Sequence, residues 1–267
     1  MSTEILVNVT TQETRVALVE SGLVQEVFVQ RESRYSVVGN LYKGTVCRVL
    51  PGMQAAFVDV GLERTAFLHA HDILPTGDVP IGEEPAIQEL VHEGQEVLVQ
   101  VVKDPLGTKG ARLTTQLSIP SRYLVLLPYS RHVGISARIE DDAERTRLKQ
   151  TLESVIAVEG ATTGFIVRTA GEGASEEALR ADVQFLMKLW DSIRRSAKDA
   201  PKASMVYGDL PMVMRILRDL MGTDVDRVRI DSAESYERVV RFARRFIPEA
   251  SDRIELYDGE GPIFDLY

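Results

Sequence analysis

The sequence predicts a mixed α+β protein with more than one domain, and three observations lead to this fold class. The chain has 267 residues, enough for two or three small domains that each bury a core. Short β-type runs separated by glycines dominate residues 4–118. From residue 119 onward, apolar residues at helical spacing alternate with short strand-like runs, so both kinds of element must be accommodated.

Composition and charge narrow the class of protein. Hydrophobic content is 44% and charged content 27%, as in ordinary soluble proteins, and no run approaches a membrane span of about 18 apolar residues. The N-terminus lacks a secretory signal, and the single cysteine, Cys47, excludes an internal disulfide. We therefore expect a cytoplasmic protein with no membrane partner, in which Cys47 is a small buried residue. The net charge of −9 is uneven, because residues 72–96 hold seven acidic residues and no lysine or arginine.

Residues 4–30 are predicted to form a meander of three strands, with a turn at Ser21-Gly22. Asn8 directly follows the first apolar strand, at a place where a metal-dependent nuclease would need a carboxylate. Because an amide alone is a poor ligand for a hard metal ion, we interpret this segment as scaffold.

Residues 36–118 are predicted to form a closed five-stranded barrel of the oligonucleotide-binding type, since the strand-like runs are short and evenly spaced. These runs are residues 40–49, 53–60, 63–68, 96–103 and 109–117. The segments 44–52, 56–61 and 66–69 resemble the S1 RNA-binding domain. The acidic stretch 72–96 is then an enlarged loop between the third and fourth strands. It is expected to be solvated, with a binding site for a protein partner as the alternative.

One face of this barrel carries the predicted RNA contacts. Rings are expected to stack on bases, and cations to contact the backbone. The aromatic candidates are Phe57, Phe67 and His69, and the cationic candidates are Lys43, Lys109 and Arg112. The alternative for the two phenylalanines is burial in the barrel core.

Residues 119–204 are predicted to form a separate α/β unit. Tyr123–Leu127 reads as a buried strand, and acidic residues at 140–142 open a helix, where they suit the helix dipole. A long amphipathic helix is expected from about Ser175, and the spacing of Trp190 places it in the core. Residues 205–267 then alternate helix, strand, helix and strand, and Asp231 with Ser232 is expected to cap the second of these helices.

The stretch Gly164–Gly171 predicts an anion pocket. A buried strand delivers Arg168 and Thr169 to its end, and small residues follow. The guanidinium offers a fixed fork of donors that matches phosphate oxygens, and the hydroxyl adds another donor. The alternative is an ordinary strand-end arginine that pairs with a carboxylate.

Several longer runs are similar to the bacterial ribonuclease E/G family. They include Asn40–Gly44, Gly107–Thr115, Tyr123–Leu127, Gly134–Ser136 and Gly164–Thr169. The resemblance covers the whole chain, and the runs 50–61, 101–107 and 262–267 resemble one branch of the family in particular.

This resemblance implies four segments. Residues 1–35 and 205–267 would together form a degenerate RNase H-like domain, split between the two chain ends. Residues 36–118, the S1 domain, and residues 119–204, a 5′-sensor region, would be inserted between them. Family members are endoribonucleases that cut single-stranded RNA, prefer a 5′-monophosphate, mature ribosomal RNA and turn over messenger RNA. They act as homo-oligomers.

The resemblance also implies roles for individual residues. Arg168 and Thr169 would hold the 5′ phosphate, while the backbone of Ser121 and the side chain of Val125 would contact the terminal nucleotide. Ser121 stands where some members have glycine, which puts the shape of the pocket wall in doubt. Ala137 likewise stands where some members have arginine, which removes one possible contact.

The family's catalytic aspartates, which hold Mg²⁺ in a DNase-I-like domain, would lie beyond Tyr267. The cysteines that share Zn²⁺ between protomers would lie later still. No matching carboxylate pair occurs in this sequence, so we expect no catalytic residue and no bound metal here, and RNA binding without cleavage. The alternative is a stand-alone RNA-binding module of the S1 type.

Overall fold

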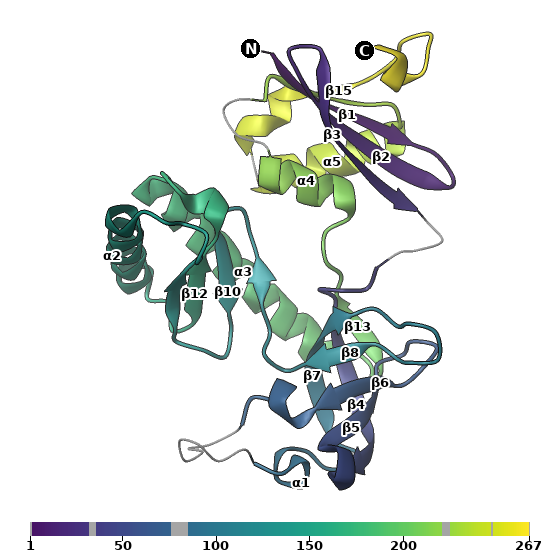
Figure 1. Cartoon of the computed structure of the whole chain (residues 1–267), viewed down its shortest axis with the longest axis vertical. Helices are drawn as coiled ribbons and strands as arrows, with labels where there is room; N and C mark the ends of the chain where they lie inside the picture. Colours follow the sequence, from purple (N-terminus) through teal and green to yellow (C-terminus); the bar gives the residue numbers. More distant parts are fainter. Residues whose placement is uncertain (1, 32–35, 76–84, 221–224, 247, 267) are drawn as a thin grey trace. The chain divides into compact units, whose positions relative to one another are not determined.

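The computed structural model describes residues 2–31, 36–75, 85–220, 225–246 and 248–266. The chain divides into two compact units (Figure 1). One unit joins Met1–Ser36 to Leu210–Tyr267, and the other is Val37–Asp209. The two ends of the chain therefore belong to the same unit.

The unit built from the chain ends contains a five-stranded sheet in the order β15-β14-β1-β2-β3. β1 (Thr3–Val9), β2 (Glu13–Glu20) and β3 (Leu23–Arg31) form the predicted antiparallel meander. β14 (Arg227–Ile230) pairs in parallel with β1, and β15 (Ile254–Leu256) pairs in parallel with β14. The last two strands thus extend a sheet begun more than 200 residues earlier in the chain.

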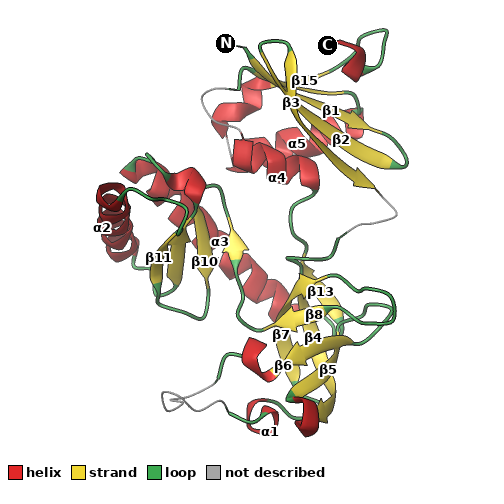
Figure 2. Ribbon diagram, viewed as in Figure 1, coloured by secondary structure: helices red, strands yellow, loops and turns green. Residues whose placement is uncertain are grey.

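Two helices cover one face of this sheet (Figure 2), namely α4 (Met212–Leu220) and α5 (Ala233–Phe246). Apolar residues of both helices and of β1 and β14 form one core cluster. On the other face, Ile263 packs with β1 and β2 residues. The prediction for Asp231 was wrong, because its carboxylate accepts hydrogen bonds from Asn8 Nδ2 at 2.6 Å and Val9 N at 2.8 Å. Ser232 Oγ accepts the α5 cap bond from Ser235 N.

The predicted five-stranded barrel is confirmed. Strands β4 to β8 run β4-β5-β6-β8-β7, and β7 pairs with β4 to close the barrel. Their bounds are β4 Leu41–Leu50, β5 Ala55–Asp59, β6 Ala66–His69, β7 Glu96–Lys103 and β8 Arg112–Thr114. Within the acidic loop, residues 76–84 lie outside the described part of the chain, and a short helix, α1, spans Ile87–Leu90.

Two features of the barrel were not predicted. β13 (Ser204–Tyr207), which comes much later in the chain, pairs antiparallel with β4. The expectation that Cys47 is buried was wrong, since Cys47 is exposed. Tyr42, Gly44 and Val46 of β4 are buried, so strand alternation places Cys47 on the outside, and the register of β4 against β5 shifts between Val46 and Arg48.

The segment from residue 119 onward contains a four-stranded sheet in the order β11-β12-β10-β9. The strands are β9 Ile119–Pro120, β10 Leu124–Leu127, β11 Val133–Ile135 and β12 Gly164–Val167. The predicted helices are present as α2 (Asp142–Glu159) and α3 (Glu176–Asp199), capped by Asp141 and Ser175. Phe165 and Trp190 lie in their common core, as expected for Trp190. No helix in the described ranges is both long and apolar enough to span a membrane.

Candidate nucleic-acid interface

Strand alternation places three aromatic rings on the outside of the barrel. Ala56, Val58 and Leu68 are fully buried, so the neighbouring Phe57 and Phe67 point away from the interior. Phe57 and Phe67 are cross-strand partners whose centroids lie 6.1 Å apart with ring planes at 69°. His69 continues the row, 6.3 Å from the Phe67 ring. Neither phenylalanine belongs to the barrel's core cluster, which favours a binding surface over the core alternative.

Phe57 and Phe67 line a groove of about 990 Å³, and His69 lies outside its lining. Its far wall is the loop after β7, where backbone hydrogen bonds join Leu106 and Lys109 in both directions and leave Leu106 80% exposed. A Cβ on Gly110 would collide with Thr65 O, so glycine there lets the loop pack against the barrel. Arg64 donates to Gly107 O from the other side. The groove is therefore apolar at its floor and has Lys103, Lys109 and Arg64 along its lining.

The structure separates the three cations predicted to contact RNA. Lys109 is exposed and lines the groove. Arg112 also lines it, but Nε and Nη2 bind Asp72 Oδ2 at 2.9 and 2.8 Å, so its charge is balanced. Lys43 does not line the groove: its ammonium group lies 3.3 Å from Glu96 and donates to Ala200 O. Hydrogen bonds from Lys202 and Lys43 lower the pKa of Glu96, as expected for a carboxylate between two cations.

The second predicted site lies where β12 ends. Arg168 N donates to Tyr123 O at 2.7 Å, which continues the pairing of β12 with β10. Its Nη1 donates to Ser121 O at 2.6 Å and to Arg122 O at 3.3 Å. These carbonyl oxygens orient the guanidinium plane. We refer to Arg168, Thr169 and the loop 121–124 as the arginine corner.

The other residues predicted here lie close to Arg168 in different ways. Thr169 is exposed, and its hydroxyl lies 3.2 Å from Ser136 Oγ. Val125 is partly buried on β10, in register with Ile166. The backbone of Ser121 is engaged within the protein, because its carbonyl accepts from Arg168 and its N–H donates to Leu124 O.

Gly171 allows the chain to turn tightly beside Arg168. A Cβ there would lie 2.7 Å from Val167 Cγ1 and 3.3 Å from Tyr123 O. A side chain at this position would push the loop away from both strands that frame the corner.

Sequence reasoning missed two side chains at the arginine corner. Ser136 lies within a run that the family resemblance had already singled out, yet no role was assigned to its hydroxyl. Asp182 belongs to α3, 60 residues beyond the loop, and its carboxylate binds Ser121, Tyr123 and Leu124. Burial raises the pKa of Asp182, and these hydrogen bonds oppose that rise. Its position beside the buried stripe of α3 is the only sequence signal that pointed to it.

Glu144 of α2 anchors the loop that follows Thr169. It accepts hydrogen bonds from Arg147 Nε and Nη2 at 2.6 and 2.7 Å, and from Gly173 N at 2.8 Å. These hydrogen bonds lower the pKa of Glu144 from 4.5 to about 2, and the bonds from Arg147 make the largest contribution.

This pKa predicts a pH-dependent contribution to stability. Folding favours the charged form of Glu144, so its contribution is complete above about pH 4.5 and is lost as the pH falls toward 2. We expect Glu144→Gln to lower the melting temperature near neutral pH, with a difference from the wild type that shrinks in acid. Thermal unfolding followed by circular dichroism across this range measures the effect. A difference independent of pH would contradict it.

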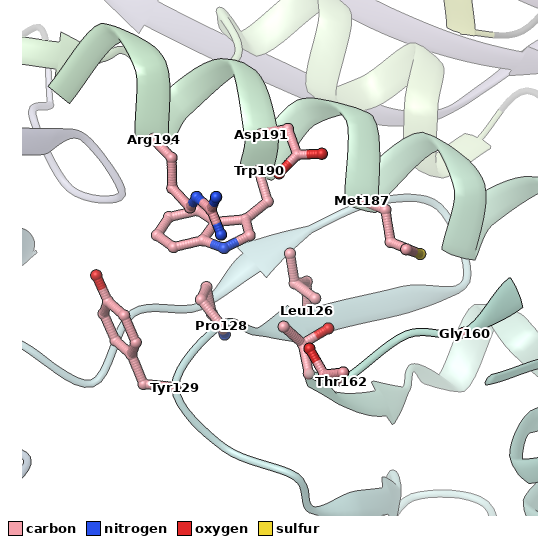
Figure 3. Close-up of a pocket in the computed structure, with 10 residues that line it drawn as sticks. Leu126, Pro128, Tyr129, Gly160, Thr162, Met187, Trp190, Asp191 and Arg194 are labelled. Atoms are coloured by element: carbon pink, nitrogen blue, oxygen red, sulfur yellow. The ribbon is translucent and has the colours of Figure 1, made fainter. Parts of the chain in front are cut away.

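A separate cavity of about 330 Å³ lies at the opposite end of β10 (Figure 3). Tyr129 and Trp190 meet there edge to face, with centroids 5.7 Å apart, and Arg194 of α3 lies beside them. Burial raises the pKa of Tyr129, and the charge of Arg194 opposes this shift. None of the residues predicted to contact RNA lines this cavity.

The described residues do not fit a metal site. Within the ranges given above, no three or more histidine, cysteine, aspartate or glutamate side chains gather where they could hold an ion.

Two models of known protein families match this chain. The model of the ribonuclease E/G family matches residues 118–267, and that of the S1 RNA-binding domain matches residues 37–115. Ribonuclease G of Salmonella typhimurium is 49% identical over 273 residues, covering 100% of this chain and 55% of that protein. Ribonuclease G of Haemophilus influenzae is 52% identical, covering 99% and 54%. Ribonuclease E of Escherichia coli is 39% identical, covering 98% and 25%. The chain thus spans about half the length of these ribonuclease G proteins.

Proposed function

Because the chain belongs to the ribonuclease E/G family and is ribonuclease G-like throughout its length, we propose that it is the RNA-recognition portion of an endoribonuclease specific for single strands. The observation that carries this proposal is the row of outward-facing rings on the S1 barrel. Stacking on such rings requires unpaired bases, because a base within a duplex has both faces covered.

The arginine corner is proposed to select a 5′-monophosphate. Two carbonyls orient the Arg168 guanidinium, and Thr169 and Ser136 present hydroxyls close to the same point. A terminal phosphate would accept charge-assisted hydrogen bonds here, each worth about 1.5–3 kcal/mol. One such bond amounts to roughly tenfold to hundredfold preference over a 5′-hydroxyl end. Val125 and the Ser121 loop would then lie beside the first nucleotide.

The remaining parts of the proposal come from the family. The substrates would be ribosomal RNA precursors and messenger RNA, cut by a homo-oligomer. Hydrolysis would use Mg²⁺ held by aspartates that the family resemblance assigns to a further domain, and Zn²⁺ would link protomers. The unit formed from both chain ends would be the degenerate RNase H-like domain. Its meander, extended by two parallel strands from the far end of the chain, supports that assignment.

One experiment tests the proposed function directly. Matched single-stranded RNAs that differ only in a 5′-monophosphate or a 5′-hydroxyl are titrated against the chain at one fixed salt concentration, since affinity depends on salt. We expect tighter binding of the monophosphate by about tenfold or more. Equal affinities would reduce the function to S1-type RNA binding. Incubation of the same RNAs with Mg²⁺ should leave them intact, and specific cleavage abolished by a chelator would contradict the proposed division of labour.

A further inference from the structure

One carboxylate oxygen organises the loop at the arginine corner. Asp182 Oδ2 lies 2.6 Å from Ser121 Oγ, 2.8 Å from Tyr123 N and 3.0 Å from Leu124 N. All three donors lie in the tight connection between β9 and β10. One oxygen therefore satisfies two backbone N–H groups and a hydroxyl that would otherwise lack these partners.

The same loop supplies the carbonyls that hold Arg168. Ser121 O and Arg122 O accept from Arg168 Nη1, while Asp182 binds the hydroxyl of Ser121 and the N–H groups of the two residues after Arg122. The peptide groups between residues 121 and 124 are thus fixed from both sides. A change in where these N–H groups point would turn the carbonyls and release the guanidinium from its orientation.

The helix that carries Asp182 is itself rigidly placed. Leu179, Val183 and Leu186 are fully buried in the core beneath the sheet. Asp182 lies beside this buried stripe, so the helix backbone fixes the carboxylate relative to β10. Burial of a carboxylate is costly unless it is hydrogen-bonded, and here the three donors offset part of that cost. The positive charge of Arg122, whose guanidinium lies 4.8 Å from the Tyr123 ring centroid, also favours the ionised carboxylate.

We propose that Asp182 is a positioning residue that presets Arg168 for the 5′ phosphate by holding the 121–124 loop. This inference rests on the proposed function of the arginine corner. Asp182 acts through the loop, and its role is geometric: it supplies an acceptor oxygen at one point. Its negative charge is not what the role requires.

Variants of Asp182 can separate the effect of its acceptor oxygen from the effect of its negative charge. Asp182→Asn keeps the shape and places an amide oxygen where Oδ2 lies, without the charge. Asp182→Leu keeps a similar volume but offers no acceptor, which leaves two N–H groups unsatisfied and the Ser121 hydroxyl with Leu124 O, at 3.0 Å, as its acceptor. Ser121→Ala removes one of the three donors and leaves the other two bound.

The experiment measures the ratio of affinities for 5′-monophosphate and 5′-hydroxyl RNA in each variant. We expect Asp182→Leu to reduce the wild-type ratio at least fivefold, Ser121→Ala to reduce it by less, and Asp182→Asn to keep it within about twofold. Affinity for the 5′-hydroxyl RNA, which reports on the barrel groove, should be unchanged in the two Asp182 variants. A general loss of stability would not produce an affinity ratio that Asp182→Asn keeps and Asp182→Leu loses.

Other outcomes overturn the inference in distinct ways. If the wild type prefers the monophosphate and Asp182→Leu keeps that preference, Asp182 does not position the corner. If asparagine fails as badly as leucine, the charge and not the acceptor matters. Should Asp182→Leu also lose 5′-hydroxyl RNA binding, it has unfolded, and an unchanged ratio in Ser121→Ala then decides against the inference. A wild type without any preference refutes the proposed role of the arginine corner and the inference with it.

Discussion

Replacing Phe57 and Phe67 together with alanine is expected to weaken binding of single-stranded RNA by roughly thirtyfold or more. Each ring that stacks on a base contributes about 1–3 kcal/mol, so two rings contribute at least about 2 kcal/mol. The pair lies edge to face at 6.1 Å on the outer surface of the barrel, where both rings border the groove. Fluorescence anisotropy with a short 5′-hydroxyl RNA measures the loss, because that ligand does not depend on the arginine corner.

The control variant is Tyr129→Ala, which removes an exposed ring that lies outside the groove. It is expected to bind the same RNA as tightly as the wild type. Thermal unfolding distinguishes the two interpretations of the phenylalanines. Loss of a buried phenylalanine typically costs 3–5 kcal/mol of stability, whereas loss of a surface ring costs far less. A double variant that melts much earlier than the wild type would show that these rings belong to the barrel's packing.

The barrel could be predicted because its information is local. Ala56-Phe57-Val58 alternates inward and outward, glycines mark the turns, and a barrel of short strands tolerates few other arrangements. The closing pair of β4 with β7 joins the first strand of the barrel to the fourth, an order that the strand count alone does not specify. Cys47 is exposed as the alternation of β4 requires, since Tyr42, Gly44 and Val46 are buried; the prediction of burial rested on residue type instead.

The electrostatics of the same surface could not be predicted from spacing. Lys43 was expected at the RNA because it lies on a barrel strand, yet Glu96 of β7 and the carbonyl of Ala200 engage its ammonium group. Ala200 follows α3, more than 150 residues away, so only the tertiary structure brings it there. Arg112 is similarly paired with Asp72, at the start of the acidic loop. Lys109 is the predicted cation that remains exposed in the groove.

At the arginine corner the sequence revealed the central residue but not its supports. Arg168 and Thr169 follow a buried strand and precede small residues, which is a local pattern. Asp182 lies on an amphipathic helix, where a carboxylate beside the apolar stripe is ordinarily solvated. Its use by the 121–124 loop depends on how α3 packs against β10, and no periodicity encodes that contact.

Arg168→Ala is expected to remove the preference for 5′-monophosphate RNA, a change of about tenfold to hundredfold in relative affinity. The variant loses the charge-assisted bonds to the phosphate, each worth about 1.5–3 kcal/mol. Affinity for 5′-hydroxyl RNA should fall by less than about twofold, because the barrel groove is untouched. Competition between the two RNAs for one preparation of protein measures the ratio without error from its active fraction.

Arg168 also has a structural role, since Nη1 donates to two carbonyls of the 121–124 loop. Arg168→Lys separates the two contributions: lysine keeps the charge but lacks the planar fork that reaches the carbonyls and a phosphate at once. We expect it to retain only a small part of the preference. An equal loss of affinity for both RNAs in the alanine variant, together with a lowered melting temperature, would mean that Arg168 holds the loop and does not bind the phosphate. If the two carbonyls only orient the guanidinium toward the phosphate, the alanine variant loses the preference for 5′-monophosphate RNA and keeps its melting temperature.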